Sequence, residues 1–194
     1  ASFRERYENI PRNNSKLNIG YPNISFCIVD IETDALIVEG NMPHILQIAW
    51  IILDYDGEII NKESFFVKNY GVTENKAYSI NNISIDTISK IGFELERVLD
   101  TFAMVLKSVN HVIVHNEEFD IHILDYYFLK YLIPTSLRKM DIFCTMTKTK
   151  EICNLRNKNN ELRYPTLEEL YFQLFKDKIK SSQNAASDAL ITAK

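Results

Sequence analysis

The chain has 194 residues, of which 46% are hydrophobic and 25% charged, and it contains three cysteines. This length and composition suit one globular domain with a full core, and they exclude a collagen, a coiled coil and a disordered chain. The longest apolar run, Ile45–Leu53, is too short to span a membrane, and the polar N-terminus lacks the apolar stretch of a signal peptide. We therefore expect an intracellular protein with no membrane partner and with reduced cysteines.

The net charge of −4 is unevenly distributed along the chain. Residues 1–137 carry 11 Lys and Arg against 19 Asp and Glu, whereas residues 138–180 carry 10 against 6. A basic segment on an acidic body favours an anionic ligand on that side, although a solvated lysine-rich loop has the same composition.

The hydrophobic pattern predicts strands first and then strands that alternate with helices. Residues 1–22 have little periodicity and are expected to form an N-terminal arm, which leaves residues 23–194 for the folded domain. The predicted strands are residues 24–31, 45–53, 58–68, 111–115 and 139–143. The predicted helices are residues 95–109, 117–131, 167–175 and a last one that runs from about 185 to the end of the chain at Lys194, and residues 147–164 are expected to form a loop.

The turn sequence Asp54–Gly57 joins the second and third predicted strands so closely that they must be antiparallel. A strand meander followed by alternating strands and helices predicts an α/β domain with a mixed sheet of five strands flanked by helices.

Four acidic residues stand out by their positions. Asp30 and Glu32 are two residues apart on the first predicted strand, so both carboxylates point to the same face. Asp120 lies in the first turn of a predicted helix, and Asp188 lies among alanines in the last helix. Either of the latter two could simply cap a helix or face solvent, but two carboxylates on one face of a central strand are costly to bury unless a metal ion or a partner binds them. Hard cations such as Mg²⁺ and Mn²⁺ prefer oxygen ligands of this kind.

Three segments that contain these acids resemble the motifs of the DnaQ-like (DEDD) 3′–5′ exonucleases. Phe26–Thr33 resembles the first motif, Val114–Asp120 the second and Gln183–Ala189 the third. The segments Ile45–Ala49 and Pro165–Leu170 also resemble connecting segments of the family. Each motif is weak alone, but together they occur in the family's order over most of residues 24–194.

The resemblance implies an RNase H-like fold and a site with two metal ions, Mg²⁺ or Mn²⁺. By position, Asp30, Glu32 and Asp188 would hold one ion, and Asp30 with Asp120 would hold the other. Two such ions about 3.5–4 Å apart can activate a water and stabilise the leaving oxygen of an in-line displacement at phosphorus. The residues implied to hold the terminal nucleotide are Thr33, Asp34, Ala35, Leu36, Asn116 and Phe119, and the candidate phosphate contacts are Lys148, Lys150, Arg156, Lys158 and Arg163.

The sequence departs from the family's pattern at Gln183. The histidine (DEDDh) branch has a catalytic histidine, the general base, five residues before the last aspartate, and the tyrosine branch has a tyrosine four residues before it; here these positions are Gln183 and Asn184. Glutamine can orient a water but cannot take its proton, and loss of a general base costs about 10²–10⁴-fold in rate. The sequence fits an engineered, weakened enzyme better than a naturally slow or inactive one.

The resemblance therefore favours a metal-dependent 3′–5′ exonuclease of the DEDDh type, attenuated by Gln183, that acts on single-stranded DNA or RNA ends, with DNA favoured. Two alternatives stay open. One is a nucleic-acid-binding module without turnover. The other is a proofreading or accessory domain of a larger replication, repair or RNA-processing assembly, because the last predicted helix continues to the end of the chain.

Overall fold

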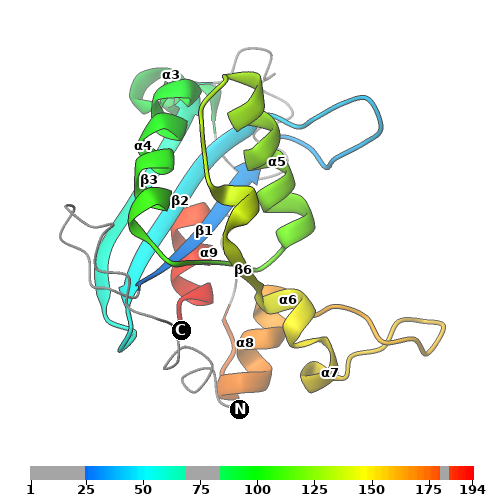
Figure 1. Cartoon of the computed structure of the whole chain (residues 1–194). Helices are drawn as coiled ribbons and strands as arrows, with labels where there is room; N and C mark the ends of the chain where they lie inside the picture. Colours follow the sequence, from blue (N-terminus) through cyan, green and yellow to red (C-terminus); the bar gives the residue numbers. More distant parts are fainter. Residues whose placement is uncertain (1–24, 69–83, 180–183) are drawn as a thin grey trace.

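A mixed β-sheet forms the centre of the molecule (Figure 1). The computed structural model of the chain describes residues 25–68, 84–179 and 184–194, so the predicted arm lies outside the described residues. The strands are β1 (Ser25–Thr33), β2 (Ile45–Asp54), β3 (Ile59–Lys68), β4 (Phe93–Glu94), β5 (His111–Val114) and β6 (Asp141–Cys144). Their order across the sheet is β4-β3-β2-β1-β5-β6.

The directions of the strands follow the predicted pattern. β1 pairs antiparallel with β2, and β2 pairs antiparallel with β3. β5 then pairs parallel with β1, and β6 pairs parallel with β5. The tight turn between β2 and β3 is held by the Asp54 carboxylate, which accepts hydrogen bonds from the N–H groups of Asp56 and Glu58, while Gly57 supplies a positive φ of 87°. The predicted mixed α/β sheet is confirmed.

Helices connect and cover the strands. They are α3 (Ile85–Ile91), α4 (Leu95–Ser108), α5 (Glu117–Lys130), the 3₁₀ turn η1 (Leu137–Lys139), α6 (Thr145–Lys148), α7 (Lys150–Cys153), α8 (Leu167–Phe175) and α9 (Ala185–Thr192). A capping box begins α8: the Thr166 hydroxyl accepts from the Glu169 N–H, and the Glu169 carboxylate accepts from the Thr166 N–H. None of the helices in the described ranges has the length and apolar character that a bilayer crossing needs.

The structure corrects three details of the prediction. The sheet has six strands rather than five, since the two-residue strand β4 pairs with the end of β3 and is too short to leave a periodic signal. The segment 147–164, expected as a loop, begins with the short helices α6 and α7; only its later part is a loop, closed by a bridge between Arg156 and Leu162. Helix α9 ends at Thr192, before the last residue.

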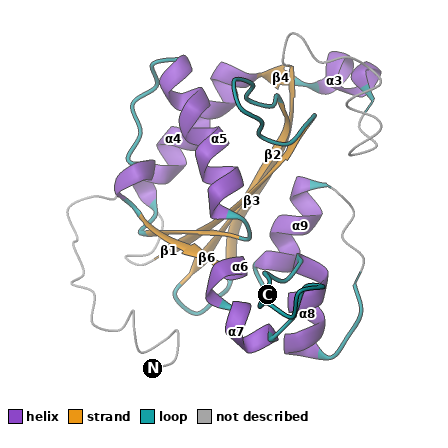
Figure 2. Ribbon diagram, turned by 90° about the vertical axis from the view of Figure 1, so that its right-hand side faces the viewer, coloured by secondary structure: helices purple, strands orange, loops and turns teal. Residues whose placement is uncertain are grey.

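Two helical layers sandwich the sheet (Figure 2). Helices α4 and α5 cover one face, where they bury the alternate β1 residues Cys27, Val29 and Ile31. Helix α9 covers the opposite face, packed on β1 and β2, with Phe26 and Ile28 among the residues beneath it. Asp30 and Glu32 continue the alternation of Phe26 and Ile28 along β1, so their side chains also point to the α9 face.

Candidate active site

The first two acids of the site come from the C-terminal half of β1. Asp30 and Glu32 are half-buried, while their neighbours Val29 and Ile31 are buried in the core on the other face. The pairing of β1 with β2 shifts register immediately after Glu32. Irregularities of this kind are common beside active sites, because they end regular pairing and re-aim the side chains that follow.

Helix α9 brings the third acid to the strand pair. Ala185 and Ala189 are fully buried against the sheet, and these small side chains let the helix approach closely. Asp188, which is 8% exposed, therefore reaches β1. One carboxylate oxygen from each of Asp30, Glu32 and Asp188 lies within 4.8 Å of the others.

Helix α5 contributes the fourth acid. Asp120 lies in the first turn of α5 and is only 5% exposed. The negative charge of Asp120 raises the pKa of Asp30, and the negative charge of Glu32 raises the pKa of Asp120. The four predicted acids are thus brought together from three elements that lie far apart in the sequence.

Burial and mutual repulsion disfavour the ionised forms of these carboxylates. Burial is the main cause that raises the pKa of Asp30 well above its usual range, and the charges of Asp120, Glu32 and Asp188 add to it. Burial and the charge of Asp188 raise the pKa of Glu32 to about 7, and burial together with Glu32 raises that of Asp120. A divalent cation would relieve this repulsion, and an all-carboxylate donor set is the type that hard cations prefer, so these residues fit the metal site that the family implies.

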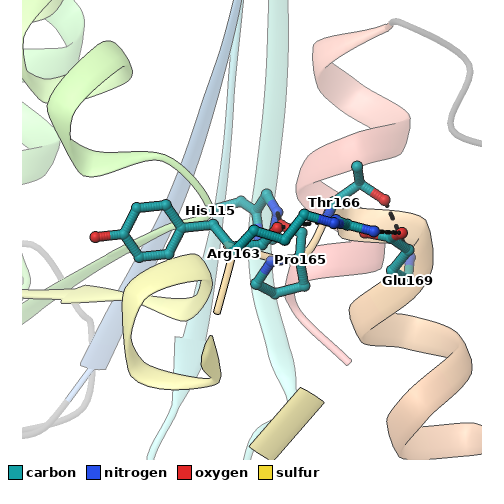
Figure 3. Close-up of polar contacts among 6 residues, drawn as sticks. His115, Arg163, Pro165, Thr166 and Glu169 are labelled. Carbon is teal, nitrogen blue, oxygen red and sulfur yellow. Dashed lines mark hydrogen bonds and ion pairs between the residues drawn. The ribbon is translucent and has the colours of Figure 1, made fainter. Parts of the chain in front are cut away.

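His115 fixes the end of β5, directly before the segment that carries Asp120. Its Nδ1 lies 2.9 Å from the hydroxyl of Thr145. Its Nε2 lies 3.2 Å from the carbonyl oxygen of Pro165, a contact that Figure 3 shows. Burial lowers its pKa, which favours the neutral ring in this position. His115 therefore supports the segment that carries Asp120, because it ties β5 to α6 and to the segment before α8.

The residues after Glu32 form the start of the β1–β2 loop. Thr33 is buried, and its hydroxyl donates to the carbonyl of Ala35. Asp34 is also buried, and its carboxylate accepts from the His44 N–H at 2.8 Å and contacts the His44 ring Nδ1 at 2.8 Å. Leu36 is 75% exposed. The side chain of Asp34 thus closes the loop, while Leu36 is presented to solvent.

The other two residues expected at the terminal nucleotide flank the start of α5. Asn116 occupies the N-cap position, but its side chain makes no capping hydrogen bond; its backbone carbonyl accepts from the Asp120 N–H at 2.8 Å. Phe119 is half-buried and packs against the large core cluster. Both residues therefore lie within one helical turn of Asp120.

The five basic residues predicted to contact phosphates lie on α6, α7 and the loop that follows. Lys148 and Lys158 are exposed. Lys150 lies 4.6 Å from the centre of the Tyr164 ring, and Arg156 donates to the carbonyl of Asn160. Arg163 makes two hydrogen bonds to the carboxylate of Glu169, at 2.8 and 2.6 Å (Figure 3). Its guanidinium is therefore engaged within the protein, and its phosphate contact stays a prediction.

Gln183, the predicted substitute for the general base, lies outside the described residues. Its neighbour Asn184 is described: it caps α9 by accepting from the Ser187 N–H at 3.3 Å.

A cavity of about 660 Å³ lies on the α8 side of the sheet and is separate from the acidic cluster. Its walls are mainly apolar side chains of β1, α8 and the end of the chain, and none of the predicted site residues lines it. This cavity is thus not where the four carboxylates meet.

Sequence reasoning missed two residues that shape the site. The ring of His44 contacts the carboxylate of Asp34, and the side chain of Gln47 accepts a hydrogen bond from the backbone of α9. His44 had no recognisable spacing to a partner. Gln47 did leave a signal, because it is the one polar residue inside the apolar run Ile45–Leu53.

Comparisons with known proteins agree with this geometry. The family model described as exonuclease, RNase T, matches residues 27–194. The chain belongs to the RNase T exonuclease family. The resemblance to DnaQ-like exonucleases is thereby confirmed, and membership makes the chain a nuclease domain of a family that depends on divalent metal ions.

Solved structures show that this chain shares the fold of E. coli Exonuclease I. The complex with a dA16 oligonucleotide and the zinc-bound complex with single-stranded DNA both match with a TM-score of 0.69 at 16% identity, and the complex with dT13 matches with a TM-score of 0.70 at 16% identity. Each match covers 88% of this chain but 39% of Exonuclease I, so the chain spans about two fifths of that protein's length. The predicted RNase H-like α/β fold is confirmed. No curated protein matches the sequence significantly.

Proposed function

We propose that this chain is a 3′–5′ exonuclease that hydrolyses phosphodiester bonds at the 3′ end of single-stranded nucleic acid, with DNA favoured over RNA. The observation that carries the proposal is the convergence of Asp30, Glu32 and Asp188, which each have an oxygen within 4.8 Å of the others, with Asp120 close enough for its charge to raise the pKa of Asp30. The similar Exonuclease I structures contain single-stranded dA16 and dT13, which supports DNA as the substrate. We place the exonuclease domain at residues 23–194 and an arm at residues 1–22.

In this proposal the four acids form two metal-ion positions. Asp30, Glu32 and Asp188 hold one Mg²⁺ or Mn²⁺, and Asp30 with Asp120 holds a second. When bound, the two ions supply an activated water and neutralise charge on the leaving oxygen. Carboxylates fixed on β1, α5 and α9 provide this site with little reorganisation, since the packing of these elements sets their positions.

The residues around the acids would bind and orient the strand. Leu36, exposed on the loop after β1, would pack against the terminal base, and Phe119 would shape the same pocket. The exposed Lys148 and Lys158, with Lys150 and Arg156 beside them, would contact phosphates further along the strand. These contacts position the backbone and read no sequence, which suits an enzyme that removes successive nucleotides.

Gln183 would limit the rate, because a glutamine amide cannot accept the proton of the attacking water. The test is a degradation assay with paired DNA and RNA oligonucleotides, labelled at the 5′ end so that removal from the 3′ end gives a ladder. We expect Gln183→His to raise the rate by about 10²–10⁴-fold in Mg²⁺ or Mn²⁺, and Asp30→Asn to abolish it. Asp100→Asn, an exposed acid on α4, is the matched control and should change nothing.

A Gln183→His protein that binds Mn²⁺ yet degrades neither DNA nor RNA ends would refute the enzyme proposal. Products that shorten from the 5′ end would refute its polarity.

Gln183 itself favours a second function: a nucleic-acid-binding module, alone or within a larger assembly, that keeps the fold and metal site without turnover. This function predicts salt-dependent binding of single strands with no cleavage in either the Gln183 or the Gln183→His form.

A further inference from the structure

A single buried amide connects helix α9 to the middle of the sheet. Gln47 is 2% exposed and is the one polar residue in the otherwise apolar run Ile45–Leu53 of β2. Its Oε1 accepts a hydrogen bond from the backbone N–H of Ala185 at 3.0 Å, across 138 residues of sequence. Its Nε2 donates to the hydroxyl of Ser64 in β3 at 2.9 Å. Because a backbone N–H can only donate, the carbonyl oxygen of Gln47 must face the helix.

Both ends of this connection lie next to metal-site acids. In the β1–β2 pairing, Gln47 stands directly opposite Glu32, so the two side chains leave the sheet on the same face. Ala185 is the first residue of α9, and Asp188 follows it within the first turn. The connection therefore joins the strand that carries Asp30 and Glu32 to the helix that carries Asp188.

The first N–H groups of a helix have no partner within the helix, and a buried one needs an acceptor from elsewhere. Asn184 supplies an acceptor for the Ser187 N–H. Gln47 supplies the acceptor for the fully buried Ala185 N–H. The local cap stabilises the helix wherever it lies, whereas the bond to Gln47 fixes its position against the sheet.

We propose that Gln47 is a positioning residue that sets the distance between Asp188 and the Asp30–Glu32 pair. The proposal rests on the proposed function, in which these three acids share a metal ion. Small alanines alone would let α9 slide on the sheet, since apolar packing is not directional. The bonds from Gln47 to Ala185 and to Ser64 are directional, and they hold the helix at one place.

The test is the affinity of the protein for Mn²⁺ alone, measured by titration calorimetry, together with amide exchange in α9. We expect Gln47→Leu to weaken Mn²⁺ binding by about 10–100-fold, as loss of a residue that orients metal ligands commonly does, and to speed exchange of the Ala185 N–H. Gln47→Glu keeps an acceptor for that N–H and can accept from the Ser64 hydroxyl, so it should bind Mn²⁺ at least as well as the wild type. Ser64→Ala removes only the acceptor of the Gln47 Nε2 and should weaken Mn²⁺ binding less than Gln47→Leu does.

A residue that only stabilised the fold would lower the melting temperature of Gln47→Leu without changing the Mn²⁺ affinity of the folded protein, and this result would overturn the proposal. If Gln47→Leu does not fold, Ala185→Pro removes the same N–H from the helix side at a position where proline is tolerated, and unchanged Mn²⁺ affinity in that variant would also overturn it.

A wild-type chain that binds Mn²⁺ but cuts no nucleic acid would refute the proposed function and leave the role of Gln47 to be judged by the affinities. A wild-type chain that binds no Mn²⁺ would refute both.

Discussion

Replacing Glu32 by glutamine should make the metal-free protein more stable while it removes a metal ligand. Glutamine has almost the same shape as glutamate but carries no charge. Burial first, and then the charge of Asp188, raise the pKa of Glu32 from 4.5 to about 7. The ionised carboxylate is therefore disfavoured in the folded state, and Glu32→Gln removes that cost.

The size of the effect follows from the pKa of Glu32. Each pKa unit corresponds to about 1.4 kcal/mol, so a rise from 4.5 to about 7 corresponds to about 3 kcal/mol. Two unit charges 4.8 Å apart interact by a similar amount, about 3.5 kcal/mol, at an effective dielectric constant of 20. Because Glu32 is only half-buried, solvent screening should reduce the observed gain to about 2 kcal/mol.

The sign depends on pH. Between pH 4.5 and 7 the folded state holds a proton on Glu32 that the unfolded chain has lost, so this residue's contribution to the free energy of unfolding falls as the pH rises through that window. We expect Glu32→Gln and wild type to be equally stable below pH 4.5 and the variant to be more stable at pH 8. Adding Mn²⁺ should reverse the order, because only the wild type keeps the full ligand set.

Urea denaturation in EDTA, followed by the fluorescence of Trp50, measures this difference. Trp50 is the chain's one tryptophan and is 1% exposed, so unfolding changes its surroundings completely. Glu58→Gln, at an exposed turn position, is the control and should change the free energy of unfolding by less than about 0.5 kcal/mol. A Glu32→Gln protein that is less stable than wild type at pH 8 in EDTA would refute the reasoning.

Three further changes test other parts of the structure. His115→Phe leaves two polar groups without their ring partner and should lower the free energy of unfolding in urea by about 1–3 kcal/mol; no change would contradict its bridging role. Glu169→Gln should lower the free energy of unfolding by about 1 kcal/mol at pH 7. Arg163 and the backbone N–H of Thr166 lower the pKa of Glu169 to about 2, so the stability difference between wild type and variant in thermal melts should disappear as the pH falls from 4.5 to 2. Changing Lys148 and Lys158 together to alanine should reduce the slope of log K against log salt for single-stranded DNA by about 1.4, and an unchanged slope would remove them from the interface.

The sequence predicts the parts of the site that depend on local periodicity. Alternation along β1 places Asp30 and Glu32 on one face, and the structure confirms it because Val29 and Ile31, on either side of Asp30, are buried on the other face. The alanines around Asp188 likewise predict the close approach of α9. Both signals are visible within a few residues of sequence.

Features that arise from distant contacts were not predictable in this way. The pairing of Asp34 with His44 and the bond from Gln47 to Ala185 join residues that share no periodic pattern. β4 exists only because the end of β3 offers it a partner. In the basic segment, lysines and asparagines gave no apolar period, so the single-turn helices α6 and α7 were expected as loop.

The distribution of the four acids along the chain has a consequence for biosynthesis. Asp30 and Glu32 are made first, Asp120 later, and Asp188 a further 68 residues along the chain. A ribosome-bound or partly unfolded chain therefore lacks one of the acids of the candidate site until helix α9 docks on the sheet. If the proposed function holds, cleavage would therefore require that β1, α5 and α9 are all in place, and a partly folded chain would have no activity.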